Sequence, residues 1–484
     1  MSLLTSPIAI EILNDLRTNY AVKATRNRCE LDRFFWLHGH RGSRRDRRLR
    51  IAPAFETPTN HRKERFRICN LVLQGGGTLG LAHAGFVTGL EAAGIRFAGL
   101  AGTSAGSILA MGVAAIRGHD ITTATHQKLI SITETAPMDT FIDGPRPIRV
   151  MIKRMLKGRG VLAPEVLSGW LAALFRLRDR RGLNPGTGFE TWFASVLDEL
   201  GWNSIDDLYE ALDAIWADLE DLRALPSDSH TAGPILRDPA KADPSLAQRP
   251  AAALLQLIAM AMPVGLKFKL PQDLYYLSAE YERVSPARLV RTSMSIPAFF
   301  DPVVMQTNKS TWPRRVQSDI TDLLTAVQSQ EFSDLNELAF LDGGMMSNLP
   351  SDSFRDLMPD VPTIVVPLVN GGSTQRITRR RRLGDLAKDA AACGQAVRLQ
   401  HDRETWAQNS PLKAAFDLAE QRDRNVRAKK RPARRYPVQI APIDTGEANW
   451  LNFVMSASEK ADLFETGLLR AQKLLKSLSA GDSL

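Results

Sequence analysis

Apolar and polar positions along the chain form blocks that predict strands alternating with helices. The mostly apolar run Ile68–Leu73 predicts a short buried strand, and a glycine-rich segment leads from it into an expected helix from Gly80 to about Ala93. Phe97–Ala101 predicts a second strand, which is followed by a helix of small apolar residues, Ala105–Ile116. This order with short connections is typical of an α/β fold in which crossover helices join the strands of a parallel sheet.

Beyond these elements the chain is predicted to be mostly helical over residues 145–225, and Pro226–Pro250 has the Pro-, Asp- and Ser-rich composition of a loop. The pattern of strands and helices then resumes toward the C-terminus. The segments involved are Asp273–Leu277, a helix near Pro286–Ser293, strands near Leu338–Leu341, Thr363–Val369 and Val438–Ile443, and a terminal helix at Ser458–Leu478.

One helix of the middle region, Glu165–Arg178, carries an apolar stripe and has basic residues at its C-terminal end. We interpret the stripe as facing the protein core, and an orientation toward a membrane is the alternative. The members of the stripe are Val166, Trp170, Ala173, Leu174 and Leu177.

Residues 1–65 differ from the rest of the chain and are predicted to form a basic N-terminal arm, partly helical or flexible. A first helix is predicted from Ser6 to about Tyr20, and an arginine-rich run extends from Arg41 to Arg50. Such runs are most often solvated segments, and a binding role is the alternative.

Bulk composition narrows the class of protein. Of 484 residues, 44% are hydrophobic, and 62 Lys and Arg against 53 Asp and Glu give a net charge of +9. The chain can therefore bury a sizeable core, and its charge favours anionic partners, either nucleic acid or an acidic membrane surface. Cys29, Cys69 and Cys393 are too few and too far apart for a disulfide framework or a zinc site, which favours an intracellular protein.

The N-terminal sequence lacks the basic and apolar regions of a secretory signal peptide. The longest nearly uncharged apolar stretch, Ala251–Gly265, is shorter than the roughly 20 residues that a membrane-spanning helix needs. We therefore expect a cytoplasmic protein without a transmembrane helix, whose contact with a membrane is at most peripheral.

The glycine-rich segment after the first strand resembles a cofactor loop, because Gly75, Gly77 and Gly80 fit the G-x-G-x-x-G pattern of dinucleotide sites. Such a site also requires an acidic residue about 20 residues beyond the glycines to bind the ribose. No carboxylate occurs between Gly94 and Ser107, so a dinucleotide cofactor is not expected.

The second strand runs into a G-x-S-x-G pattern, Gly102–Gly106, which lies between a strand and a helix. The flanking glycines allow a tight turn that presents the hydroxyl of Ser104 at its tip, next to the positive end of the helix dipole. Ser104 is thus a candidate nucleophile. Attack on an ester creates an oxyanion, which the backbone amides of Gly75, Gly76 and Gly77 are placed to bind.

A serine nucleophile also needs a base, and the histidines are poor candidates. His401 lies in a charged, helical-looking segment, and His83 lies on the helix after the glycine loop, where a packed histidine is more common. Asp342 ends an apolar strand and precedes Gly343 and Gly344, which places it to point into a cleft. A plain turn capped by the aspartate explains the local sequence equally well.

Taken together, these motifs resemble the patatin-like phospholipase family, over a region from about Arg67 to Leu475. Gly75–Gly80 is similar to the family's G-G-G-x-R/K-G loop, Gly102–Gly106 to its G-x-S-x-G and Asp342–Gly344 to its D-G-G/A. Leu79 stands where the family usually has Arg or Lys, so the loop lacks that cation. Further similar segments are Gly182–Trp192, Val290–Val303 and Ile443–Phe453, together with Asn348 and Pro350 after the D-G-G.

The resemblance implies a three-layer α/β/α sandwich around a mainly parallel sheet. The basic arm at 1–65 lies outside the resemblance, and the chain beyond it is predicted to form a catalytic domain at 66–478, in which residues from about 145 to 250 form a helical insertion or lid. The implied activity is phospholipase A-type cleavage of acyl esters of membrane glycerophospholipids, without a metal or an organic cofactor. Asp342 would take the proton of Ser104, the amides of Gly76 and Gly77 would bind the oxyanion, and an acyl-enzyme would form.

The expected partner is a phospholipid membrane surface or a lipid aggregate, and the need for an activator or a homo-oligomer is left open. Leu79 makes a membrane-binding or scaffold protein with little or no turnover the main alternative. Nucleic-acid binding through Arg376–Arg382 and Arg422–Arg435 is less expected, because these runs lack interleaved aromatic residues and a recognisable module.

Overall fold

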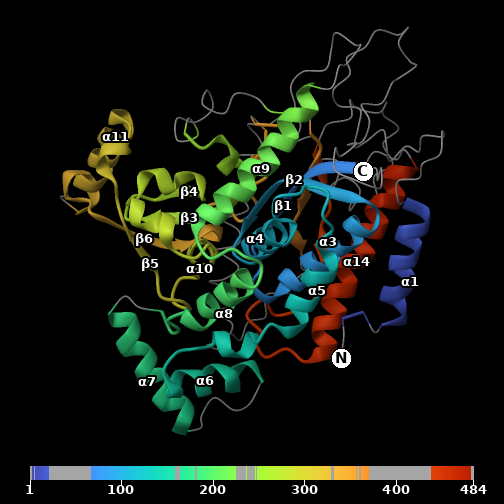
Figure 1. The fold of residues 1–484 in the computed structure, drawn as a ribbon. Helices are drawn as coiled ribbons and strands as arrows, with labels where there is room; N and C mark the ends of the chain where they lie inside the picture. Colours follow the sequence, from blue (N-terminus) through green and yellow to red (C-terminus); the bar gives the residue numbers. More distant parts are fainter. Residues whose placement is uncertain are drawn as a thin grey trace, which may run out of the picture.

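A mostly parallel sheet forms the centre of the computed structural model, with the strand order β5-β6-β3-β2-β1-β7-β9 and β4 paired with β3 beside this path (Figure 1). The predicted α/β class with a mainly parallel sheet is confirmed. The arginine-rich runs and His401 lie outside the described residues. The structure describes residues 3–4, 6–20, 67–157, 164–179, 182–224, 236, 246, 248–328, 332–355, 357–358, 361–369 and 438–480.

The strands predicted around the glycine loop form the middle of the sheet. β1 (Arg67–Leu73) lies between β2 (Ile95–Thr103) and β7 (Thr363–Val366) and runs parallel to both. Every residue of β2 is buried, as is usual for a parallel strand covered on both faces. β9 (Val438–Ile440) continues the parallel sheet beside β7, while β8 (Leu368–Val369) and β10 (Ile443–Asp444) form a separate parallel pair.

The strand β3 (Leu255–Met262) was not predicted, although it lies next to β2 in the sheet. It falls within Ala251–Gly265, an apolar run without the alternation that marks a half-exposed strand, because both of its faces are largely buried. The sequence predicted that the pattern of strands and α-helices resumes at Asp273–Leu277. This prediction is wrong, because Gln272–Tyr276 forms a 3₁₀ helix. β3 pairs antiparallel with β4 (Leu266–Leu270) and β6 (Glu337–Asp342), and β6 pairs antiparallel with β5 (Val303–Gln306).

Glycines allow the helices beside β1 to approach one another closely. α3 (Gly80–Ala92) is buried along its whole length and packs against the terminal helix α14 (Ala457–Ser479). A Cβ atom at Gly85 would clash with the carbonyl of Phe464, and one at Gly467 would clash with the carbonyl of Ala82. The third helix of this region, α4 (Ala105–Arg117), follows β2 and contacts it closely.

The first helix of the predicted arm packs on the body of the protein. α1 (Pro7–Asp15) is capped by Ser6 and lies beside α14 (Figure 1). The hydroxyl of Ser6 donates to Glu465 over 2.7 Å, and Gln472 donates to Asp15 over 2.6 Å. Leu16, just beyond α1, is fully buried, so this part of the arm belongs to the hydrophobic core.

In the region predicted to be helical, the residues that the structure describes form four α-helices, and α6 and α7 lie beyond α8 and away from the sheet (Figure 1). The prediction that the stripe of α7 faces the core is wrong. Trp170 and Leu174 are 45% and 62% exposed, and of the stripe Ala173 alone is buried among the side chains described. The four helices are α6 (Arg146–Leu156), α7 (Pro164–Arg178), α8 (Thr187–Asp198) and α9 (Ile205–Ala224).

The described part of the chain contains three further α-helices. Across the part of the chain that the structure describes, no helix is both long enough and apolar enough to span a bilayer. These remaining helices are α5 (His126–Thr135), α10 (Ala287–Ser293) and α11 (Arg314–Gln328).

Candidate active site

Ser104 occupies the turn between β2 and α4, in a backbone conformation that is rare for a residue with a side chain. Its φ of 51° and ψ of −117° depart from ordinary strand and helix values. The carbonyl of Ser104 accepts hydrogen bonds from the amides of Ser107 and Ile108, and its own amide donates to the hydroxyl of Ser293 over 3.0 Å. These contacts hold a strained turn at the end of the strand, with the serine largely buried.

The two glycines that flank this serine are required by close packing. A Cβ atom at Gly102 would clash with the backbone of Gly106, and one at Gly106 would clash with the carbonyl of Leu73 in β1. The turn therefore fits closely between β1 and α4, as expected for the G-x-S-x-G pattern.

The glycine loop lies directly against the serine. A Cβ atom at Gly75 would lie 3.3 Å from the Cβ atom of Ser104. The amide of Gly75 donates to the carbonyl of Asn348 over 3.0 Å, so it is already used within the protein. Among the described residues, the amides of Gly76 and Gly77 have no hydrogen-bond acceptor, and they are the donors that the loop can offer to an oxyanion.

Asp342 is the last residue of β6 and is largely buried. Its amide donates to the carbonyl of Ser295 over 2.8 Å, and its carboxylate accepts the amide of Gly344 over 2.7 Å. In the sheet, Asp342 pairs with Ala259 of β3, while Thr103 pairs with Ile258 on the other side of the same strand. The strand ends that carry Ser104 and Asp342 therefore flank β3.

Asn348 connects the two halves of the site. Its side-chain amide donates to the carbonyl of Gly75 over 3.2 Å, in addition to the bond from the Gly75 amide to its carbonyl. Its Oδ1 atom would lie 2.8 Å from a Cβ atom at Gly344, which itself contacts the carboxylate of Asp342. The predicted motif residues thus form a continuous series of contacts from Ser104 to Asp342, and Pro350 is buried just beyond Asn348.

Ser293 and Ser295 are site residues that sequence reasoning missed. Ser293 accepts the amide of Ser104 and donates its hydroxyl to the carbonyl of Ile258 over 2.6 Å. Ser295 contributes its carbonyl to Asp342. Both serines lie in Val290–Val303, a segment that resembles the family, but nothing in the local sequence indicated which of its residues contact the catalytic candidates.

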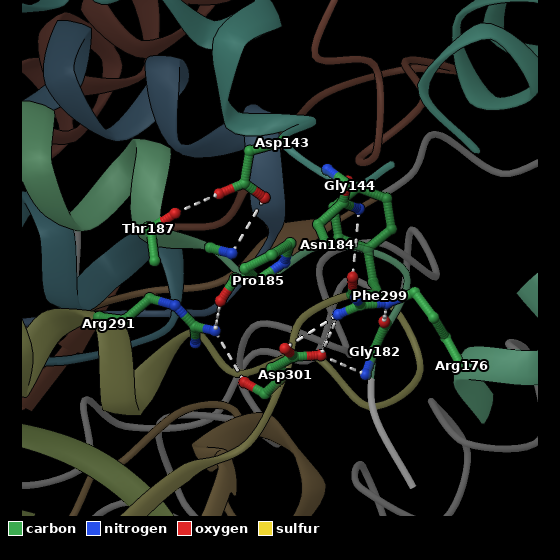
Figure 2. Close-up of polar contacts among 11 residues, drawn as sticks. Asp143, Gly144, Arg176, Gly182, Asn184, Pro185, Thr187, Arg291, Phe299 and Asp301 are labelled. Atoms are coloured by element: carbon green, nitrogen blue, oxygen red, sulfur yellow. Dashed lines mark hydrogen bonds and ion pairs between the residues drawn. The ribbon is translucent and has the colours of Figure 1, made fainter. Parts of the chain in front are cut away.

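A buried arginine supports this segment (Figure 2). The guanidinium of Arg291 donates to the carbonyls of Pro185 and Asp301 and to the hydroxyl of Ser295, each over 2.7 Å. Arg291 is 2% exposed, and burial lowers its pKa to about 10 although nearby carboxylates oppose this effect. It therefore remains charged at neutral pH and connects the segment after α7 to the residue that binds the Asp342 amide.

The same network reaches the ends of α6 and α7 (Figure 2). The carboxylate of Asp301 accepts Arg176, near the end of α7, over 2.8 Å and the amide of Gly182 over 2.6 Å. Asn184 accepts the amide of Gly144, just before α6, over 2.9 Å and donates to the carbonyl of Phe299 over 3.1 Å. The start of α6 and the end of α7 are therefore joined to the same hydrogen-bond network.

Comparison with known proteins identifies the family of this chain. The sequence model described as Patatin-like phospholipase matches residues 71–355, more than half of the chain. The chain belongs to the patatin-like phospholipase family. A bacterial relative, the uncharacterized protein YqhO of Bacillus subtilis (strain 168), is 27% identical over 240 residues, which are 50% of this chain and 60% of that protein. The chain thus spans less than two thirds of the length of this relative.

Among solved structures, the crystal structure of VipD from Legionella pneumophila is similar with a TM-score of 0.35 and 16% sequence identity. The similarity covers 84% of this chain and 67% of that chain.

In this member of the family, Leu79 occupies the loop position where the family usually has a cation. The side chain is buried in a small apolar cluster with Leu81 and Leu463, against which Trp450 packs. The loop is attached to the same segment, because the amide of Thr78 donates to the carbonyl of Trp450 over 2.8 Å. Position 79 therefore serves apolar packing beneath the glycine loop in this chain.

Replacing Leu79 with arginine is expected to lower the free energy of unfolding by about 2 kcal/mol without raising the hydrolytic rate, because the guanidinium would enter an apolar cluster. Urea unfolding and ester hydrolysis measure the two effects, and Leu79→Met is the matched control, with a loss below about 1.5 kcal/mol. A Leu79→Arg protein that is as stable as wild type and faster would show that this position can accommodate the family's cation.

His83 is a packed histidine of α3. It is fully buried, and its Nε2 atom lies 3.0 Å from the carbonyl of Gln74, to which it donates. Burial lowers its pKa to about 4, while the hydrogen bond to Gln74 opposes the shift. The imidazole is therefore neutral at pH 7 and holds the residue that precedes the glycine loop.

This histidine is expected to make the protein sensitive to acid. Between pH 6.5 and pH 4 the unfolded chain binds a proton at His83 and the folded protein does not, so stability falls as the pH falls. The pKa difference corresponds to a loss of roughly 3 kcal/mol over that window. Urea unfolding across this pH range should show that the free energy of unfolding falls less for His83→Gln than for wild type. His119→Gln changes an exposed histidine, and its free energy of unfolding should fall as much as that of wild type.

Proposed function

We propose that this protein cleaves acyl ester bonds of glycerophospholipids as a phospholipase A, with Ser104 as nucleophile and Asp342 as base. The observation that carries the proposal is the positive φ of Ser104, 51°, at a strand-to-helix turn, with Gly75 against its Cβ atom. Strain of this kind persists only where the surrounding structure maintains it, and it concentrates at functional sites. Membership of the patatin-like phospholipase family supports a lipid ester as the substrate.

In the proposed reaction the Oγ atom of Ser104 attacks the acyl carbonyl carbon while its proton passes to Asp342. The carbonyl oxygen becomes an oxyanion, which the amides of Gly76 and Gly77 stabilise. Collapse of this intermediate breaks the ester bond, and the departing lysophospholipid oxygen takes the proton from Asp342. Water then attacks the acyl carbonyl carbon and gives a proton to Asp342. When this second intermediate collapses, the bond to the Oγ atom of Ser104 breaks, Oγ takes the proton back from Asp342, and the fatty acid is released.

A fluorophosphonate probe tests the nucleophile directly. Wild-type protein is expected to form a stable adduct whose mass is assigned to the peptide containing Ser104, and Ser104→Ala is expected to form none. Release of fatty acid from phospholipid vesicles, analysed together with the lysophospholipid product, tests the substrate. Protein that binds lipid vesicles but neither reacts with the probe nor releases fatty acid would instead be a scaffold with the same fold.

A further inference from the structure

The helix α7 presents large apolar side chains to solvent and small residues to its neighbour. Six of the twelve large hydrophobic side chains that are exposed in the described part of the chain lie on this helix. Toward α6 it presents Gly169, where a Cβ atom would contact Met151 closely, and Ala173, about one turn further along the helix, is buried. This arrangement is the reverse of an ordinary surface helix, in which the large apolar residues are buried.

The exposed residues form one continuous stripe. Leu167, Trp170, Leu171, Leu174 and Phe175 follow the spacing i, i+3, i+4, i+7 and i+8, which places them on a single face of an α-helix. Phe175 and Leu167 are 68% and 63% exposed. Contiguous apolar patches of this kind on soluble proteins mark surfaces that bind another apolar body.

The partner helix α6 supplies positive charge beside this stripe. Its sequence, RPIRVMIKRML, contains four basic residues and no acidic residue. The exposed Arg146, Arg149 and Lys157 line a shallow surface groove on this helix, together with Lys153, which pairs with Asp139. Ile148, Met151 and Ile152 are buried, so the basic residues lie on the outer side of the helix. An apolar stripe beside basic residues is complementary to anionic lipid, whose headgroups are negative and whose acyl chains are apolar.

The base of the helix pair is attached to the segment that supports the site. Arg176, near the end of α7, is bound by Asp301, whose carbonyl accepts Arg291 (Figure 2). Arg291 in turn binds Ser295, the residue whose carbonyl accepts the amide of Asp342. The exposed stripe therefore has a defined attachment to the catalytic strand ends.

We propose that the α6–α7 pair is the surface by which this protein docks on a bilayer that contains anionic phospholipid. The stripe of α7 enters the boundary between headgroups and acyl chains, and the arginines and lysines of α6 contact the lipid phosphates. The inference rests on the proposed function, because the bilayer is also the source of the ester substrate.

Vesicle co-sedimentation of the full chain tests the proposal, with vesicles of phosphatidylcholine alone and of equal parts phosphatidylcholine and phosphatidylglycerol. Wild-type protein is expected to bind the mixed vesicles, and the double variant Leu174→Ser/Phe175→Ser to bind them at least tenfold more weakly. The matched control is Ile8→Ser/Ile10→Ser, which removes two exposed apolar side chains from α1 and should bind as wild type does. Equal binding by both double variants would overturn the docking surface.

The charge component has its own variant, Arg146→Gln/Arg149→Gln. It is expected to reduce binding to the mixed vesicles and to remove the preference over phosphatidylcholine alone. A wild-type protein that binds both vesicles equally would contradict the role of α6. A wild-type protein that sediments as a dimer, while Leu174→Ser/Phe175→Ser is a monomer and both bind vesicles equally, would assign the stripe to a second copy and overturn the proposal.

Two further measurements separate this proposal from the proposed function. Hydrolysis of a soluble short-chain ester should be the same for wild type and Leu174→Ser/Phe175→Ser, because docking is not needed for a dissolved substrate. Ser104→Ala should still bind vesicles as wild type does. A wild-type protein that binds the mixed vesicles but hydrolyses no ester would count against the catalytic proposal alone. Amide hydrogen exchange of α7 should slow when mixed vesicles are added, and unchanged exchange there would contradict docking through this helix.

Discussion

Ser104→Ala is expected to lower kcat for phospholipid hydrolysis by at least about 10⁴-fold, with little change in KM. The hydroxyl is the only atom group removed, and the acyl-enzyme cannot form without it. Substrate contacts elsewhere and the amides of Gly76 and Gly77 remain, so binding of the ester should persist. Initial rates of fatty-acid release at several lipid concentrations separate kcat from KM.

Asp342→Asn should lower kcat by about 10²–10⁴-fold, since it removes a general base but retains an oxygen that can accept the amide of Gly344. Because the two residues act in the same step, the double variant with Ser104→Ala should be no slower than Ser104→Ala alone. If the rate losses of the two single variants instead multiply in the double variant, the two residues act independently, which would contradict a shared mechanism.

The controls for these variants are a serine and an aspartate elsewhere in the chain. Ser351 is buried, and its hydroxyl has no hydrogen-bond partner among the described residues, so Ser351→Ala should retain both rate and stability. Asp120 is exposed beyond the other end of α4 from Ser104, and Asp120→Asn should also be neutral. Wild-type rates in Ser104→Ala, measured beside these controls, would refute the assignment of the nucleophile.

Arg291→Met is expected to lower the free energy of unfolding by about 3–5 kcal/mol, which is the range for breaking a buried charged network from one side. The loss leaves the carbonyls of Pro185 and Asp301 without their donor and removes a positive charge beside the carboxylate of Asp301. It also removes a donor to Ser295, which contacts Asp342. Urea unfolding measures the stability, and fluorophosphonate labelling reports whether the site remains assembled.

Arg288→Gln is the matched control, because Arg288 lies one turn earlier on α10 and forms a partly exposed ion pair with Glu190. Ion pairs that solvent reaches are worth about 1 kcal/mol or less, so this change should cost far less stability than Arg291→Met. The free energy of unfolding of Arg291→Lys should lie between those of Arg291→Met and Arg288→Gln, because lysine retains the charge but lacks the planar set of donors of arginine. Similar stabilities of Arg291→Met and Arg288→Gln would contradict a supporting role for the buried arginine.

The local elements of this protein were predictable from neighbouring residues. The strand–turn–helix units β1–α3 and β2–α4 follow from apolar runs interrupted by glycines, and the G-x-S-x-G turn follows from residues that are consecutive in the chain. These features depend on conformational preferences over a few residues, which the order of amino acids encodes directly. The three motifs that define the family are local in the same sense.

The order of strands in the sheet could not be predicted in this way. β3 lies between the strands that carry Ser104 and Asp342, yet its continuous apolar sequence has the same character as a buried helix segment. The use of the Gly75 amide by Asn348, and the contact of Ser293 with Ser104, likewise join residues that are distant in the chain.

The direction of the α7 stripe shows the same limit most clearly. Its apolar periodicity predicted one buried face, but of that predicted stripe Trp170, Leu174 and Leu177 are exposed and only Ala173 is buried among the side chains described, while Gly169 packs closely against Met151 of α6. Periodicity indicates that a helix has an apolar face, whereas the packing partner of each face depends on contacts made across the whole chain. Local order in this protein is therefore encoded by adjacent residues, while the assembly of the site and the exposure of α7 arise from long-range packing.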